Sequence, residues 1–231
     1  MTTIENNLQA VRQRIAAACE AAGRKPSEVR LLAVSKTFPA ASVREVLAAG
    51  QQELGENYIQ EAVAKITELG DAGATWHCIG PIQGNKTRLV AAHFDWAQSV
   101  DRLKIAQRLN DQRPAHLPPL QVCIQVNTDG GPTKAGVAPE ALPELAQQIA
   151  QLPRLRLRGL MTIPEPAPDF AAACALHARA RALFDRLNTQ GLGLDTLSMG
   201  MSADLEAAIH AGSTMVRVGT AIFGGRTRAA P

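Results

Sequence analysis

The sequence predicts an α/β fold, a single-domain TIM-type (β/α)8 barrel with an extra helix at its N-terminus. About eight short apolar segments alternate with segments of helical periodicity, which is typical of parallel βα units. The chain has 231 residues, close to the ~250 of such a barrel. The turn after the first apolar segment, residues 35–39, contains no glycine, whereas a doubly wound open sheet usually has a glycine-rich turn there.

The first 25 residues predict an amphipathic helix that packs against the body of the domain. Ile4, Leu8, Val11 and Ile15 recur at the spacing of one helical face, and polar residues separate them. Gly23 marks the end of this helix. The alternation of strands and helices begins directly afterwards.

Eight strands are expected to form the barrel wall, with helices between them. The strands are predicted at Leu31–Ser35, Gln52–Leu54, Thr75–Ile79, Trp96–Ser99, Leu120–Val126, Arg158–Thr162, Thr196–Met199 and Met215–Val218. The helices are predicted at Ala41–Ala49, Tyr58–Leu69, Lys86–Ala92, Leu103–Asn110, Pro139–Gln151, Phe170–Thr189 and Ala203–Ala211. A loose tail is expected at residues 227–231, and residues 1–231 are predicted to form one domain.

The composition is that of an ordinary globular chain and argues against several functional classes. Hydrophobic residues make up 46% and charged residues 19%, so a packed core rather than disorder is expected. The net charge of +3 is spread along the chain, and no basic run with interleaved aromatic residues indicates nucleic-acid binding. No apolar run approaches the roughly 20 residues that cross a membrane, and no apolar leader is present. We therefore expect a cytoplasmic protein with neither a nucleic-acid nor a membrane partner.

The cysteines and histidines show no metal-site pattern. The four cysteines are far apart and form no CxxC pair, and the five histidines have no ligand spacing. No metal is predicted, and the cysteines are expected to pack as small hydrophobic residues.

Lys36 stands directly after the first predicted strand, at the end of the barrel where active sites lie. Desolvation at such a mouth favours the neutral amine, which is the form that a Schiff base requires. A solvated lysine just past a strand is the alternative interpretation.

The last two predicted strands end in residues that suit a phosphate. Segments 197–204 and 215–220 each run from apolar residues into Gly, Ser or Thr, and barrels commonly hold phosphates after strands seven and eight. Ser202 is predicted to cap the next helix. Arg217 lies between two valines and is expected to face the interior, where it needs a partner. That partner is either a carboxylate such as Glu56 or an acceptor on a bound ligand.

Several segments, taken in order, resemble the pyridoxal 5′-phosphate homeostasis proteins, the YggS/PROSC-type family. The matching segments are Leu32–Thr37, Gly55–Tyr58, Trp76–His77, Ile79–Gln83, Asn85–Lys86, Gly159–Met161, Leu197–Leu205 and Val216–Gly225. The sequence departs from the family pattern at Phe38, Cys78, Gly84 and Gly131. The resemblance implies a barrel similar to the N-terminal domain of bacterial alanine racemase.

The resemblance also implies a set of cofactor-binding residues for pyridoxal 5′-phosphate. Lys36 matches the lysine that forms the internal aldimine with this cofactor. Phosphate-binding positions match Ser202, Gly219 and Thr220, with Ser198, Met199 and Gly200 shaping the same loop. Arg217 matches the residue that hydrogen-bonds the pyridine nitrogen, and Asn57, His77 and Met161 match residues that line the pocket.

The function implied is to hold, buffer or deliver the cofactor in vitamin B6 homeostasis, without appreciable catalysis. An arginine at the pyridine nitrogen makes the cofactor a weaker electron sink. Alanine racemases add a tyrosine base from a second domain, whereas Tyr58 is the only tyrosine here and is expected to begin a helix. The expected partners are the cofactor and the enzymes that would receive it, and a monomer is expected.

Two alternatives stay open at this point. One is a weak pyridoxal phosphate-dependent racemase or lyase with Lys36 as its sole base. The other is a cofactor-free Schiff-base aldolase that acts on a sugar phosphate. The role of the loop around Lys134 is also open.

Overall fold

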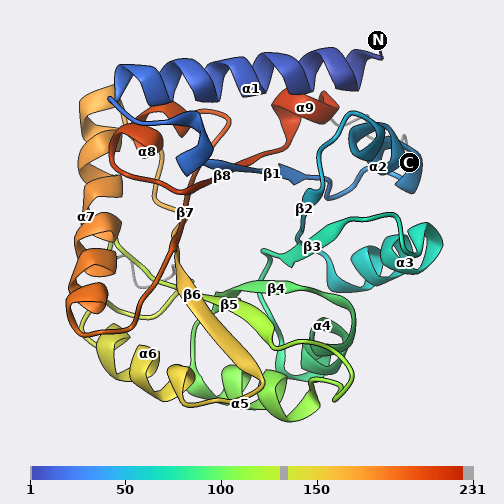
Figure 1. Ribbon diagram of the computed structural model, residues 1–231. Coiled ribbons are helices and arrows are strands. Elements are labelled where there is room, and N and C mark those ends of the chain that lie inside the picture. The colour runs from blue at the N-terminus through green and yellow to red at the C-terminus, as the bar shows by residue number, and fades with distance from the viewer. Residues whose placement is uncertain (1, 131–134, 226–231) are drawn as a thin grey trace.

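The computed structural model describes residues 2–130 and 135–225 and shows a closed barrel of parallel strands (Figure 1). The strands are β1 (Arg30–Val34), β2 (Glu53–Glu56), β3 (Thr75–Cys78), β4 (Trp96–Val100), β5 (Leu120–Gln125), β6 (Leu155–Met161), β7 (Thr196–Met201) and β8 (Met215–Val218). Each strand pairs with the next along the chain, and β8 closes the ring on β1. The predicted fold class is confirmed.

Helices surround the ring, and each connection between consecutive strands contains one (Figure 1). The α-helices are α1 (Thr3–Ala21), α2 (Ala40–Ala48), α3 (Ile59–Leu69), α4 (Thr87–His93), α5 (Leu103–Gln112), α6 (Leu142–Ala150), α7 (Phe170–Thr189), α8 (Leu205–His210) and α9 (Thr220–Phe223). Two 3-10 turns, η1 (Pro26–Glu28) and η2 (Gly84–Lys86), precede β1 and α4.

Side chains alternate along the strands, so the buried residues form one core between the strands and the helices and another inside the barrel. Ala33 and Val216 belong to the main core, which fills the space between the strands and the helices. Leu32, Val34 and Met215 belong to a smaller cluster with interior neighbours. The strands therefore present one set of side chains to the helices and the other to the barrel interior.

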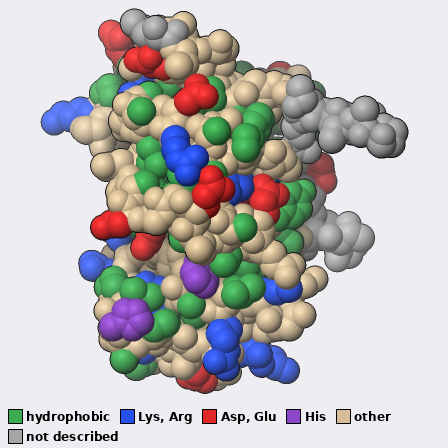
Figure 2. All heavy atoms as spheres, turned by 90° about the vertical axis from the view of Figure 1, so that its right-hand side faces the viewer, with side chains coloured by type: hydrophobic (Ala, Val, Ile, Leu, Met, Phe, Trp, Pro, Cys, Tyr) green, Lys and Arg blue, Asp and Glu red, His purple; other side chains and the backbone are tan. Residues whose placement is uncertain are grey.

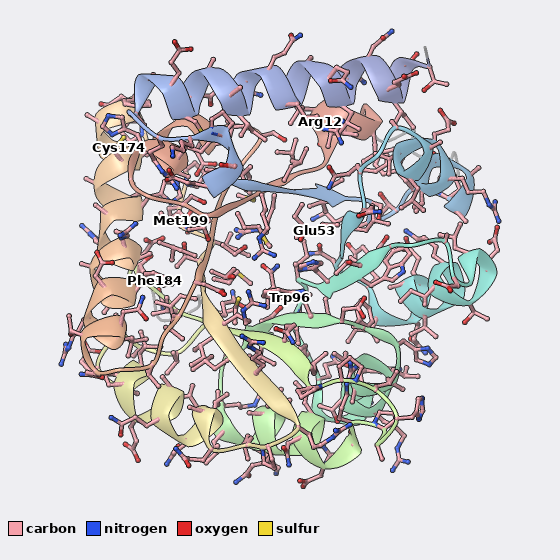
Figure 3. All side chains as sticks on the ribbon, in the orientation of Figure 1. Arg12, Glu53, Trp96, Cys174, Phe184 and Met199 are labelled. Atoms are coloured by element: carbon pink, nitrogen blue, oxygen red, sulfur yellow. The ribbon has the colours of Figure 1, made fainter. Side chains whose placement is uncertain are left out.

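The predicted N-terminal helix is α1, which packs on α8, α9 and α2 (Figure 1). Leu8, Val11 and Ile15 form its buried face. Arg12 ties the helix to the end of α2 through the carbonyls of Ala49 and Gly50, at 3.3 and 3.1 Å (Figure 3).

A stack of aromatic and arginine side chains lies in the barrel interior, toward the amino ends of the strands. Trp96 of β4 lies inside the ring, and the guanidinium groups of Arg30 and Arg158 lie 5.1 and 5.0 Å from its ring centroid (Figure 3). The His77 ring stacks on the same indole, with 5.0 Å between the centroids. This stack closes the barrel below the strand ends.

Most strands differ from their predicted bounds by one or two residues, and β6 differs most. β6 begins at Leu155 rather than Arg158, because it pairs with β5 along its whole length. Two arginines of this stretch make ordered contacts. Arg158 contacts the Asp195 carboxylate at 2.6 Å, and Arg154 donates to the Leu117 carbonyl over 2.7 Å.

β2 extends through Glu56, beyond the predicted end at Leu54, since it pairs with β3 as far as Cys78. Among the helices, α6 begins at Leu142 rather than Pro139. The short helix α9 after the last strand was not predicted.

The face formed by α2, α3 and α4 has mixed charge, with acidic and basic side chains interspersed among hydrophobic ones (Figure 2). Arg44 and Glu68 form an exposed ion pair there, with 3.0 Å between their atoms. None of the described helices combines the length and apolar character needed to cross a bilayer. Lys134 and the predicted tail at 227–231 lie outside the described residues.

Candidate functional site at the carboxyl ends of the strands

Lys36 follows β1 at the carboxyl end of the barrel, as the sequence predicts. Leu32 and Val34 face the interior, where they cluster with Met215. Because strand side chains alternate, Lys36 belongs to the same face as these two residues. Its side chain is half-buried. An amine thus stands at the rim of the barrel interior.

Arg217 of β8 is buried inside the barrel and donates two hydrogen bonds. One goes to the Ser198 hydroxyl over 2.8 Å, and the other goes to the Thr162 carbonyl over 2.6 Å. Burial lowers the pKa of Arg217 to about 10, so the guanidinium is still charged at neutral pH. Glu56, one of the two kinds of partner considered for Arg217, is not that partner, because it contacts Lys65 of α3 instead, at 2.7 Å.

A directed chain of hydrogen bonds crosses the barrel from Arg217. Since Arg217 can only donate, the Ser198 hydroxyl accepts from it and donates to Gln98 Oε1 over 2.7 Å. The Gln98 amide nitrogen then donates to His77 Nδ1 over 2.9 Å. His77 is neutral, because burial and nearby Arg30 hold its pKa well below the usual range. Its hydrogen is therefore on Nε2.

Several buried side-chain polar atoms have no hydrogen-bond partner among the described residues, and three of these atoms lie near the strand ends in the candidate site. They are His77 Nε2, Asn57 Oδ1 and Thr162 Oγ1, on or just after β3, β2 and β6. A buried polar atom without a partner is energetically costly, and native proteins rarely leave one so. These atoms are consistent with a polar ligand.

The residues predicted to hold a phosphate lie at two adjacent strand ends. β7 pairs with β8, with Met201 opposite Arg217, so Ser202 comes next to the segment that contains Gly219 and Thr220. A Cβ on Gly219 would lie 3.1 Å from the Val34 carbonyl of β1, so the backbone approaches closely there. The structure brings these predicted residues together.

Met199 and Gly200 act through packing and backbone rather than through side chains at the mouth. Met199 is buried in the main core between the strands and the helices (Figure 3). Gly200 has φ +93°, and a Cβ there would lie 2.4 Å from the Ala208 side chain. Met161 instead clusters with Trp96 in the barrel interior.

The prediction that Ser202 caps the helix after β7 is wrong. α8 begins at Leu205, and Asp204 is its N-cap residue. The Asp204 carboxylate accepts from the Met201 backbone N–H over 2.7 Å and contacts His177 Nε2 of α7 at 2.9 Å. Asp204 therefore fixes the loop that carries Ser202.

A cavity of about 370 Å³ lies on the outer side of this loop. The segment 164–170 forms one wall, and residues of α7 and α8, including His177 and Asp204, form the other. It neighbours the strand ends but does not contain Lys36 or Arg217. Within the described residues, no group of His, Cys, Asp and Glu side chains is arranged to hold a metal ion.

Sequence reasoning missed Gln98 and the contact that Thr162 makes with Arg217. Gln98 is a polar residue in the middle of the apolar strand segment 96–100, and that anomaly could have identified it. Thr162 contributes its backbone carbonyl to Arg217, which no side-chain pattern indicates.

The fold and the site together define a barrel protein of the alanine racemase N-terminal domain class, and that family's model matches residues 6–227. The chain is 62% identical over 231 residues to the pyridoxal phosphate homeostasis protein of Pseudomonas aeruginosa, covering 100% of this chain and 99% of that protein. It is 55% identical over 229 residues to the protein of the same name from Escherichia coli K12, covering 98% of both. The chain belongs to the family of pyridoxal phosphate homeostasis proteins.

A solved structure is similar over nearly the whole chain. PipY of Synechococcus elongatus PCC7942, solved with PLP bound, has a TM-score of 0.83 and 40% sequence identity to this chain. The match covers 96% of this chain and 100% of PipY.

Proposed function

We propose that this chain binds pyridoxal 5′-phosphate at the barrel mouth and acts in intracellular vitamin B6 homeostasis as a carrier or buffer of the cofactor. The observation that carries the proposal is the set of unpaired buried atoms of Asn57, His77 and Thr162 beside the charged Arg217. The cofactor has a hydroxyl, a ring nitrogen and a phosphate that can satisfy such groups. The PLP-bound relative PipY supports the same assignment.

Lys36 is the residue that we expect to bond covalently to the cofactor. When bound, the cofactor supplies an aldehyde that a neutral amine attacks. A carbon–nitrogen double bond forms between the aldehyde carbon and the Lys36 nitrogen. The aldehyde oxygen leaves as water with the two amine hydrogens.

Arg217 supports a carrier rather than an efficient enzyme. Its guanidinium is charged and only donates, so it suits a pyridine nitrogen that carries no proton. A ring held in that state is a weaker electron sink, which slows amino-acid chemistry. Tyr58 stands at the start of α3 with 53% of its surface exposed, and this position does not suit a second base.

Ser202, Gly219 and Thr220 are the residues that we expect to contact the phosphate. Two hydroxyls and a closely approaching backbone segment meet at neighbouring strand ends, and the same loops hold phosphates in many barrels. The Asp204 carboxylate, two residues after Ser202, is engaged with His177 and the Met201 N–H.

The test is binding of pyridoxal 5′-phosphate to purified protein, measured by equilibrium dialysis and absorbance before and after borohydride reduction. The wild type is expected to bind one equivalent and to acquire a stable adduct on reduction. Lys36→Ala is expected to lose the adduct, whereas Lys104→Ala, at an exposed position of α5, retains it. A wild-type protein that binds no cofactor would contradict the proposal. A Lys36 adduct formed only with a sugar phosphate would favour the aldolase alternative.

A weak pyridoxal phosphate-dependent activity is the second candidate, and the alanine racemase domain match favours it. Lys36 would then be the sole base. Incubation of the loaded protein with L-alanine or D-alanine tests this activity. Absence of racemised or eliminated product supports the carrier, and product lost in Lys36→Ala supports the enzyme. The cytoplasmic setting, the monomeric state and delivery to client enzymes belong to the carrier proposal.

A further inference from the structure

A buried ion pair between β2 and α3 holds the turn that carries Lys36. Glu56 at the end of β2 accepts a 2.6 Å hydrogen bond from the Ser35 hydroxyl. Lys65 of α3 donates to the Ser35 carbonyl over 2.9 Å and to the Glu56 carboxylate over 2.7 Å. Ser35 is therefore fixed at its side chain and at its carbonyl, immediately before the lysine.

Thr37, immediately after Lys36, is held by a third contact from the same helix. Its φ is +68°, and no other non-glycine among residues 2–130 and 135–225 has a positive φ. That conformation is strained for any residue other than glycine. Glu61 of α3 accepts from the Thr37 N–H over 2.9 Å, and Lys65 contacts the Glu61 carboxylate at 2.9 Å. The strained residue is thus anchored to α3.

Stability alone does not account for these charged groups. The side chains of Lys65 and Glu56 are only 7% and 0% exposed. Burial raises the pKa of the Glu56 carboxyl despite the opposing hydrogen bonds from Lys65 and Ser35. A buried ion pair is often no more stabilising than apolar residues of similar size. The charged groups instead fix the orientation of the backbone, because they bind hydrogen-bond donors and acceptors of both neighbours of Lys36.

Because side chains alternate along a strand, anchoring Ser35 also sets the direction of the Lys36 side chain. Ser35 points away from the interior toward Glu56, so Lys36 projects to the opposite face, over the barrel mouth. We refer to Glu56, Glu61 and Lys65 together as the clamp. We propose that the clamp positions Lys36, holding the backbone on both sides so that its amine meets the cofactor aldehyde. This inference rests on the proposed covalent role of Lys36.

The experiment compares Glu61→Ala with Glu61→Gln, because the glutamine oxygen can still accept from the Thr37 N–H. Pyridoxal 5′-phosphate is mixed with cofactor-free protein, and the rate of covalent addition is followed by stopped-flow absorbance. Borohydride reduction and peptide mapping identify the modified lysine. Glu61→Ala is expected to slow addition at Lys36 by about tenfold to a hundredfold, as a misplaced reacting group does. Glu61→Gln is expected to restore most of the rate.

Lys65→Met tests the contact with the Ser35 carbonyl, and it is expected to slow addition in the same range. Arg44→Ala is the matched control, because its ion pair with Glu68 also reaches α3 but does not touch the turn. Thermal melting of each cofactor-free variant establishes that it is folded. Should Lys65→Met fail to fold, the Glu61 pair still decides, since Glu61 is partly exposed.

The outcomes separate this inference from the proposed function. Slow addition in Glu61→Ala, recovery in Glu61→Gln and a wild-type rate in Arg44→Ala support the clamp. A wild-type rate in Glu61→Ala, or equal slowing in both Glu61 variants, overturns it while Lys36 remains the modified residue. A wild-type protein that is not modified at Lys36 overturns the proposed function itself.

Discussion

Arg217 and Ser198, on neighbouring strands β8 and β7, share a 2.8 Å hydrogen bond inside the barrel. This contact sets the direction of the chain that continues through Gln98 to His77. It therefore determines that the hydrogen of neutral His77 is on the unpartnered Nε2. A single guanidinium thus orders polar groups on three further strands.

The substitution Ser198→Ala tests this chain of hydrogen bonds. The change removes the acceptor for Arg217 and the donor for Gln98, both of which are buried. The free energy of unfolding of the cofactor-free protein is expected to fall by about 1–3 kcal/mol. Urea denaturation at neutral pH measures it, with the exposed Ser27→Ala as control. Equal stability of the two variants would contradict the hydrogen-bond chain.

The sequence was sufficient to predict the barrel, because each strand and helix has its own hydrophobic period. Alternation likewise placed Arg217 in the interior and Lys36 at a strand end. The contacts of Glu56 and Lys65 depend on how α3 packs against β2, which no local pattern encodes.

The choice of helix cap shows the same limit of local reasoning. Ser202 and Asp204 both have side chains that can cap a helix. The contact with His177, which comes from α7, fixes Asp204 in that place.

Gly200→Ala tests the packing of the β7 loop. Gly200 and Gly191 have similar φ values, +93° and +86°, so alanine at either position costs roughly 1–2 kcal/mol of strain. Only at Gly200 would the new Cβ also meet a side chain, that of Ala208 at 2.4 Å, whereas Gly191 has open space. Gly200→Ala is therefore expected to lose more stability and to weaken cofactor binding. Equal melting temperatures and equal cofactor affinities in the two variants would argue against this packing role.

Asp204→Asn tests the acid sensitivity of the same loop. Burial opposes ionisation of Asp204, but hydrogen bonds from His177 and the Met201 N–H outweigh it and lower the carboxyl pKa. Because the carboxyl pKa is lower in the folded state, ionised Asp204 stabilises the fold at any pH above its pKa in the unfolded chain, about 3.9. This stabilisation is lost as the pH falls through the pKa of the folded state. The difference in unfolding free energy between wild type and Asp204→Asn is therefore expected to be constant above about pH 5 and to narrow as the pH falls below it.

Urea denaturation at several pH values measures that gap. Asp71→Asn, in an exposed loop, is the control and should show no comparable gap. A gap of constant size across the range would mean that Asp204 ionises alike in both states.

Thiol labelling tests the burial of the cysteines. Burial raises the pKa of Cys78 and of Cys123 to about 12, so neither forms a reactive thiolate at neutral pH. Iodoacetamide is expected to modify half-buried Cys174 first in the folded protein and the buried thiols only after unfolding. Rapid labelling of Cys123, which lies inside the barrel, would contradict the interior packing.

Lys36 is the residue that we propose bonds to the cofactor, and peptide mapping tests this role most directly. The protein is mixed with one equivalent of pyridoxal 5′-phosphate, reduced with borohydride and digested, and modification is quantified at each of the six lysines. Modification is expected to concentrate at Lys36, with the buried Lys65 unmodified. Modification spread evenly over the exposed lysines, or located elsewhere, would contradict it.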